Sequence, residues 1–270
     1  MTDRYARMFA RLGNQGAFGA FVMLGDPDLA TSAAIIDALV DAGADMLEVG
    51  IPFSDPVADG PTIQAAAVRA LAQGVTPADC FALLRAFRER HPDVPVGVLT
   101  YANIVLARGM EAFYARCAEA EVDSVLVADV PAREAEPFVK AARAHGIASV
   151  LIAATNTPPE TLQRVAELGG GYTYCVARAG VTGAETEMQL GHDALFARLA
   201  EYGAPPPVLG FGISRPDHVR AALSAGAAGV ISGSAIVKLI ETGPNPIPAI
   251  KAFVAEMKQA CAPAEAGAQP

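Results

Sequence analysis

The feature that most limits the fold of this chain is an alternation of short apolar runs and amphipathic stretches, repeated eight times. Several of the apolar runs are continuous stretches of Val, Ile and Leu, which is typical of parallel strands covered on both faces. The expected strands are Ala17–Met23, Asp45–Gly50, Pro95–Tyr101, Asp123–Ala128, Ile147–Ala153, Gly171–Val176, Pro207–Gly212 and Ala228–Ser232.

Helical periods lie between these runs and predict α/β architecture with right-handed crossovers. The expected helices are Leu29–Asp41, Ala78–Arg90, Glu111–Ala120, Ala132–His145, Pro159–Leu168, His192–Tyr202 and Pro216–Ala225. An open doubly wound sheet is the competing architecture. Eight units without an internal linker, and glycine loops late in the chain, favour a single (β/α)₈ TIM barrel. We expect one domain over residues 1–262 and a disordered tail over residues 263–270.

Two short additions to the barrel are expected. An extra N-terminal helix, Tyr5–Leu12, should cover the bottom of the barrel, and a short extra helix should begin at the loop after the eighth strand.

Composition excludes several classes of function. The formal charge is −9 without a basic block, which argues against nucleic acid as a partner. No apolar run approaches the ~20 residues of a membrane span, and no signal core follows the N-terminus, so we expect a cytoplasmic protein. The four cysteines form no CxxC pair and are expected to be reduced and packed. The four histidines show no ligand spacing and are expected to be exposed, so no metal site is predicted.

The second strand carries Glu48 on the face opposite to Leu47 and Val49. The apolar face is expected to pack against the surrounding helices, so Glu48 should point into the barrel near its C-terminal mouth. Active sites of barrel enzymes lie at this end. Burial there would raise its pKa toward values useful for proton transfer. A structural glutamate bonded to a neighbouring strand is an equal alternative.

The long loop after this strand carries Asp55 and Asp59. Asp59 could simply form an Asx-turn before Gly60, with Pro61 at the first helical position. Its pairing with Glu48 favours a second hypothesis, in which two carboxylates across one mouth act as acid and base.

The sixth strand carries Tyr172 and Tyr174 on one face, with Tyr174 nearer the mouth. Core packing is favoured for Tyr172 and is as good a hypothesis as substrate contact for Tyr174. The polar, glycine-rich stretch that follows, through Leu190, is typical of a lid.

Glycine loops follow the last two strands, at Gly210–Ser214 and Ser232–Lys238. Barrel phosphate sites often form from these two loops and the start of a short helix, where backbone N–H groups and the helix dipole attract an anion. Ser234 could add a hydroxyl donor. The alternative is two tight turns that require glycine.

Together these segments resemble the tryptophan synthase alpha chain family over nearly the whole chain. The most specific segments are Leu47–Gln64 (with GIPFSDPVADGPTIQ), Tyr101–Asn103, Asp123–Pro131, Arg178–Glu185 and Gly210–Lys238. The resemblance implies retro-aldol cleavage of indole-3-glycerol phosphate to indole and glyceraldehyde 3-phosphate, in the last steps of L-tryptophan biosynthesis.

The resemblance also implies a role for individual residues. Glu48 and Asp59 match the catalytic carboxylates, and Thr182 would meet Asp59 when the lid closes. The substrate-binding residues it implies are Phe21, Tyr174, Thr182, Gly183, Phe211, Gly212, Gly233 and Ser234. Pro52, Asp55 and Asn103 would face a beta chain in an α₂β₂ complex. No cofactor is implied for this chain, since pyridoxal phosphate belongs to the beta chain.

Three positions depart from the family pattern. Ala20 and Met23 stand where Pro and Thr are usual, and Ala177 replaces a common Ser. Two other functions stay open: a sugar-phosphate isomerase or epimerase on another phosphate-binding barrel, and a non-catalytic subunit that activates a beta chain.

Overall fold

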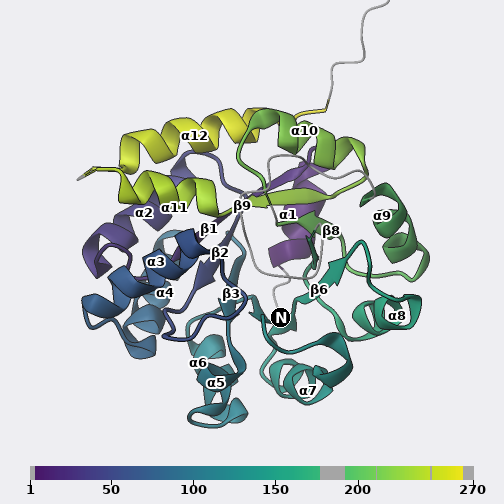
Figure 1. The fold of residues 1–270 in the computed structure, drawn as a ribbon, viewed down its shortest axis with the longest axis horizontal. Coiled ribbons are helices and arrows are strands. Elements are labelled where there is room, and N and C mark those ends of the chain that lie inside the picture. The colour runs from purple at the N-terminus through teal and green to yellow at the C-terminus, as the bar shows by residue number, and fades with distance from the viewer. Residues whose placement is uncertain (1–3, 177–191, 211, 244, 264–270) are drawn as a thin grey trace, which may run out of the picture.

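The computed structural model describes residues 4–176, 192–210, 212–243 and 245–263. Within them, parallel strands form a central barrel, and helices surround it (Figure 1). The strands are β1 Ala17–Met23, β2 Met46–Gly50, β3 Val96–Thr100, β4 Ser124–Val127, β5 Ala148–Ser149, β6 Leu151–Ala154, β7 Thr173–Val176, β8 Pro207–Leu209 and β9 Gly229–Ser232. Each lies within or within one residue of a strand expected from the apolar runs.

The barrel closes through the fifth predicted strand. The strand order is β5-β4-β3-β2-β1-β9-β8-β7-β6, and β5 and β6 are two parts of one predicted strand, separated by Val150. The part before Val150 pairs with β4 and the part after it pairs with β7. This strand therefore bridges the two ends of the sheet, and the prediction of a closed barrel is confirmed.

The helices follow the predicted alternation, and most of them begin and end at or within one residue of the predicted bounds. Among the described residues, three helices lie outside the expected set: Pro61–Ala72, Ala102–Leu106 and Ile247–Gln259. The predicted helix Ala132–His145 is split into a short 3₁₀ turn and α7, because Pro137 cannot donate a hydrogen bond and occupies the first turn of α7. The helices are α1 Arg4–Leu12, α2 Leu29–Asp41, α3 Pro61–Ala72, α4 Pro77–Arg90, α5 Ala102–Leu106, α6 Met110–Glu119, η1 Ala132–Glu134, α7 Glu136–Ala144, α8 Pro159–Leu168, α9 His192–Glu201, α10 Pro216–Ser224, α11 Ser234–Glu241 and α12 Ile247–Gln259.

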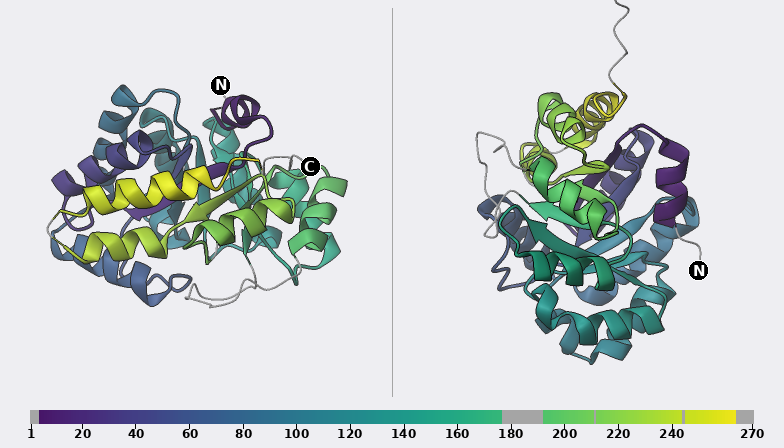
Figure 2. Two further views of the ribbon diagram at one scale, coloured as in Figure 1. Left: turned by 90° about the horizontal axis from the view of Figure 1, so that it is seen from above. Right: turned by 90° about the vertical axis from the view of Figure 1, so that its right-hand side faces the viewer.

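Helix α1 covers one open end of the barrel (Figure 2). Its Tyr5 hydroxyl is hydrogen-bonded at 2.8 Å to Ser124 Oγ, at the first residue of β4. The Tyr5 ring also packs against Tyr172, just before β7. These contacts lie at the N-terminal ends of the strands, so the predicted cover of the barrel bottom is confirmed. The opposite end of the barrel holds the loops that follow the C-terminal ends of the parallel strands.

The core consists of the strands and the inward sides of the helices. All seven residues of β1 are buried, as expected for a strand covered on both faces. The four cysteines are free and buried, as predicted. The prediction of exposed histidines was wrong: His192 is 4% exposed, and the other three are half-buried, because helix ends here pack against neighbouring elements. No helix in the described ranges is long and apolar enough to cross a membrane.

Candidate active site

Glu48 points into the barrel from β2. Its Oε1 accepts a hydrogen bond of 2.8 Å from the hydroxyl of Tyr172, which immediately precedes β7. Strands β2 and β7 are separated in the sheet by β1, β9 and β8 on one side, so this bond crosses the barrel interior. Glu48 is 2% exposed, and its Oε2 has no hydrogen-bond partner among the described residues. The inward direction is the one that strand alternation predicts.

Asp59 lies in the loop between β2 and α3 and is 6% exposed. Its backbone N–H donates to the carbonyl of Pro56, and its own carbonyl accepts from Gln64 Nε2 at 2.7 Å. Helix α3 begins at Pro61 with Gly60 as its N-cap and without a side-chain cap. These backbone contacts hold the loop, and the carboxylate of Asp59 is hydrogen-bonded to the Tyr101 side chain.

The two carboxylates have raised and unequal pKa values. Burial raises the pKa of Glu48 to about 7; the hydrogen bond from Tyr172 opposes this increase, and the charge of Asp59 adds to it. Burial raises the pKa of Asp59 to about 6, against a hydrogen bond with Tyr101 that lowers it. Between these values Asp59 is ionised while Glu48 keeps its proton. Such a pair has one anion and one acid in the same site.

Tyr101 and Tyr172 are site residues that the sequence did not identify. Tyr101 follows β3 directly, stacks on Phe53 with ring centroids 5.4 Å apart, and its hydroxyl accepts from the Ala58 N–H at 3.3 Å. Core packing, the favoured hypothesis for Tyr172, is confirmed, and its hydroxyl also donates to Glu48. The available signal was the shared face of Tyr172 and Tyr174, which points both side chains into the barrel.

Tyr174 and Phe21 lie on the barrel interior near the C-terminal ends of the strands. The Tyr174 hydroxyl donates to the carbonyl of Gly210 at 2.9 Å. Phe21 pairs in register with Glu48, and a Cβ atom at Gly233 would lie 3.4 Å from the Phe21 side chain. Phe21 therefore lies between β2, which carries Glu48, and the loop after β9. In this position its ring can pack against a flat apolar ligand.

The two glycine loops lie side by side because β8 pairs with β9. The Ser232 hydroxyl joins them by donating to the carbonyl of Ile213 at 2.6 Å. Gly212 is exposed and has φ +72°, a conformation that favours glycine. Gly233 is the N-cap of α11, where no side-chain cap binds the first amides, and Ser234 is exposed at the first helical position. Free amides at a helix start suit an anion.

Three predicted substrate residues, Thr182, Gly183 and Phe211, lie outside the described residues, as does Ala177. Among the expected partner residues, Asp55 and Asn103 are exposed, whereas Pro52 is buried within the chain. The same two segments also expose Val57 at 68% and Leu106 at 49%, which the sequence did not single out.

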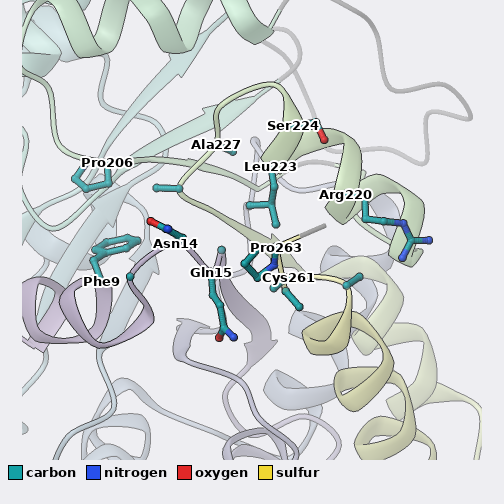
Figure 3. Close-up of a pocket in the computed structure, with 15 residues that line it drawn as sticks. Phe9, Asn14, Gln15, Pro206, Arg220, Leu223, Ser224, Ala227, Cys261 and Pro263 are labelled. Carbon is teal, nitrogen blue, oxygen red and sulfur yellow. The ribbon is translucent and has the colours of Figure 1, made fainter. Parts of the chain in front are cut away.

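One pocket at the N-terminal end of the barrel has a different lining. A pocket of about 580 Å³ lies between the α1–β1 connection, α10 and the end of α12 (Figure 3). Asn14, Gln15 and Arg220 are polar residues in its lining, which contains no carboxylate. Within the described part of the chain, no cluster of His, Cys, Asp or Glu has the arrangement of a metal site. The buried carboxylate pair at the C-terminal end, with its raised pKa values, is the candidate active site.

Comparison with known proteins agrees with this geometry. The family model described as "Tryptophan synthase alpha chain" matches residues 9–266. Tryptophan synthase alpha chains of Aeromonas hydrophila and Escherichia coli are 57% and 55% identical to this chain over 264 residues, which cover 96% of it and 98% of each relative.

Solved structures show the same similarity. Tryptophan synthase subunit alpha from Legionella pneumophila has a TM-score of 0.88 at 29% identity, covering 97% of this chain and 99% of the other. A chain of the tryptophan synthase α₂β₂ complex of Pyrococcus furiosus has a TM-score of 0.83 at 37% identity, covering 90% and 98%. The chain therefore belongs to the tryptophan synthase alpha chain family, the lyases of tryptophan biosynthesis.

Proposed function

We propose that this chain cleaves indole-3-glycerol phosphate into indole and glyceraldehyde 3-phosphate, with Glu48 and Asp59 as its catalytic residues. The observation that carries the assignment is the pair of buried carboxylates, 2% and 6% exposed, with Glu48 held by Tyr172 across the barrel. Burial raises the pKa values of both. Membership of the family supports the substrate, and one catalytic domain over residues 1–262 is part of the proposal.

The two carboxylates have different tasks in the cleavage. Glu48 transfers its proton to C3 of the indole ring, which places positive charge on the ring nitrogen. Asp59, ionised beside N1–H, stabilises that charge electrostatically. Glu48, now ionised, takes the proton of the adjacent glyceryl hydroxyl. The bond between C3 and the glyceryl carbon then breaks, its electrons return to the ring, and the hydroxyl carbon becomes the aldehyde.

The remaining site residues bind the two ends of the substrate. Phe21 and Tyr174 flank the indole ring from the barrel interior. The phosphate is bound by Gly212, Gly233 and Ser234. The family resemblance adds Thr182, Gly183 and Phe211 to the substrate-binding residues, and these three lie outside the described residues. The exposed start of α11 and the left-handed backbone of Gly212 support this orientation.

The half-reaction needs no cofactor, because two proton transfers and one electrostatic contact account for every step. The partner is a beta chain that holds pyridoxal phosphate, in an α₂β₂ complex like that of the Pyrococcus furiosus relative. Asp55 and Asn103, with the exposed apolar side chains of Val57 and Leu106, support a docking surface on these loops. Pro52 would contribute by shaping the loop from within. We propose that the reaction takes place in the cytoplasm.

Release of indole from indole-3-glycerol phosphate by the purified chain, with and without a beta chain, tests the proposal. We expect slow release that accelerates when the partner is added. Glu48→Gln and Asp59→Asn should each lower turnover by at least about 100-fold, the usual contribution of a general acid or a transition-state charge contact. Substrate binding should persist in both variants. No release under any condition would overturn the assignment, and release unaffected by Glu48→Gln would overturn its role.

A further inference from the structure

Three hydroxyl groups gather in the barrel interior around Gly97. A Cβ atom at this position would lie 2.7 Å from Ser124 Oγ, 3.0 Å from the Tyr5 hydroxyl and 3.8 Å from the Tyr172 hydroxyl. Gly97 pairs in register with Glu48 on one side and with Ser124 on the other. The hydroxyls and the carboxylate therefore share one layer of the barrel, and only glycine leaves room for them.

These groups form two hydrogen bonds and one ring contact. Tyr172 donates to Glu48 Oε1, and Tyr5 is bonded to Ser124, each at 2.8 Å. The rings of Tyr5 and Tyr172 pack with centroids 5.4 Å apart at 59°. All four side chains are at most 3% exposed. Because buried polar groups without partners are costly, this set favours one arrangement of Tyr172 and Glu48.

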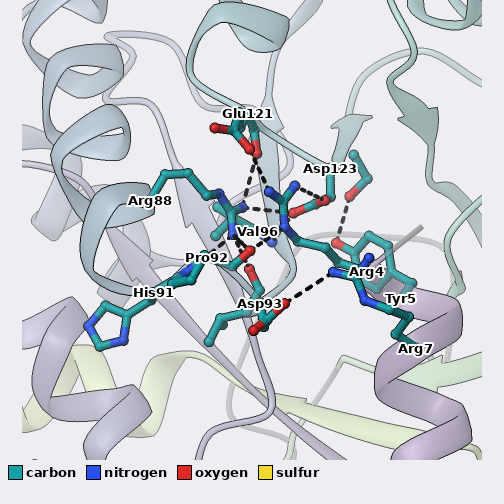
Figure 4. A network of polar contacts seen from close by, with 12 residues as sticks. Arg4, Tyr5, Arg7, Arg88, His91, Pro92, Asp93, Val96, Glu121 and Asp123 are labelled. Atoms are coloured by element: carbon teal, nitrogen blue, oxygen red, sulfur yellow. Dashed lines mark hydrogen bonds and ion pairs between the residues drawn. The ribbon is translucent and has the colours of Figure 1, made fainter. Parts of the chain in front are cut away.

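Tyr5 is held in place from outside the barrel. Its neighbour Arg4 bonds to Asp123 at 3.0 Å and to Glu121 at 2.5 Å, and Arg88 bonds to the other oxygen of Asp123 at 2.9 Å (Figure 4). Asp123 directly precedes Ser124. The ion pairs and the Tyr5–Ser124 bond therefore join the same two segments, α1 and the start of β4.

Resting on the assignment of Glu48 as the proton donor, we propose that Tyr5 is a positioning residue for Glu48. It acts through Tyr172, from the opposite end of the barrel. Tyr5 and Ser124 keep the Tyr172 hydroxyl on Oε1, which leaves Oε2 as the oxygen that exchanges a proton with substrate. Helix α1 is thus part of the active-site support as well as the cover of the barrel.

The titratable groups around Glu48 are Asp59, Tyr5, Tyr172 and Tyr174. Burial holds the pKa of each tyrosine well above its ordinary value, so these hydroxyls stay neutral wherever the enzyme works. Only the two carboxylates then titrate in the neutral range. A weaker hydrogen bond from Tyr172 would raise the pKa of Glu48, because that bond favours the ionised form.

Hydroxyl deletions test the inference in the complex with a beta chain, with indole-3-glycerol phosphate as substrate. Tyr172→Phe should lower kcat by about 10-fold to 100-fold through misplacement of the acid, with KM changed less than about 3-fold. The alkaline limb of the pH dependence of kcat should move to higher pH by about one unit. A shift of this size corresponds to the loss of one hydrogen bond to a charged group.

Tyr5→Phe and Gly97→Ala should also lower kcat and move the alkaline limb to higher pH. The effects of Tyr5→Phe should be smaller than those of Tyr172→Phe. In the Tyr172→Phe background, Tyr5→Phe should have no further effect on kcat, because the two residues act through one bond. Tyr114→Phe is the matched control: Tyr114 is also buried, but lies on α6 against Phe113.

Three outcomes overturn the inference. The first is that Tyr5→Phe and Tyr172→Phe lower kcat independently of each other. The second is an unchanged alkaline limb in Tyr5→Phe and Gly97→Ala, and the third is an equal loss of kcat in Tyr114→Phe. If Gly97→Ala does not fold, the single and double variants of Tyr5 and Tyr172 still test the inference. Failure of the proposed function is distinguishable, because the wild-type chain would then release no indole, or Glu48→Gln would release it at the wild-type rate.

Discussion

The unequal pKa values of the carboxylate pair predict a narrow pH optimum for kcat/KM. The proposed reaction needs Asp59 ionised and Glu48 protonated in the free enzyme. As pH falls through about 6, Asp59 gains a proton and loses the charge that stabilises the indole cation. As pH rises through about 7, Glu48 loses the proton that it must deliver. Activity should therefore decline on both sides of a maximum between these values.

The size of the decline follows from the two pKa values. With values of about 6 and about 7, roughly 60% of the enzyme carries the active protonation state near pH 6.5. At pH 8 that fraction is about 9%, so kcat/KM should decrease about sevenfold from its maximum. The alkaline limb is the diagnostic one, because a substrate phosphate also titrates near a pH of about 6.

The assay is the initial rate of indole release at low substrate concentration, from about pH 5 to 9 at constant ionic strength, with excess beta chain. Circular dichroism at each pH checks that the chain remains folded. In the residual activity of Glu48→Gln the alkaline limb should be absent, whereas Tyr114→Phe should keep the wild-type profile. A kcat/KM that stays level or increases between pH 7 and 9 would refute the assignment of Glu48 as the initial acid.

Three further changes have defined outcomes. Gly210→Ala would place a methyl carbon 2.1 Å from Tyr174 Cζ, so the ring must move and the indole site with it; we expect KM to increase at least about 10-fold, and an unchanged KM would contradict the contact. Arg69→Met removes the bidentate partner of Asp26, whose side chain is fully buried, and should cost about 3 kcal/mol in urea unfolding; a loss below about 0.5 kcal/mol would show that the pair contributes little. Leu39→Ala opens a cavity in the core at a fully buried side chain and should cost about 2–5 kcal/mol by the same measurement, with kcat unchanged at a temperature where the variant is folded.

The local sequence pattern accounts for the order of the helices and strands, but not for the break within the fifth strand. Helices α2 and α8 begin and end at the residues predicted, because apolar periodicity and terminal residues are local signals. The break of the fifth strand at Val150 has no clear signal, since Ile147–Ala153 is apolar except for Ser149 and contains neither glycine nor proline. It arises because one end of that strand pairs with β4 and the other with β7 as the barrel closes.

The candidate site divides in the same way. Strand alternation alone turns Glu48 inward, and glycine loops after the last two strands indicate an anion site. The hydrogen bond from Tyr172 joins residues 124 positions apart, and Tyr101 reaches Asp59 from another strand. Such partners depend on which strands are neighbours and which face each other across the barrel, and no local pattern contains this information.

The sequence by itself determined the alternating architecture, the closed barrel, the face of Glu48 and the resemblance to a family, because each depends on residue spacing or on contiguous motifs. Only the tertiary structure decided the protonation of the pair and the hydroxyls gathered around Gly97. A pKa depends on burial and on charges brought near from distant segments, and burial is complete only when the barrel has closed around the carboxylate.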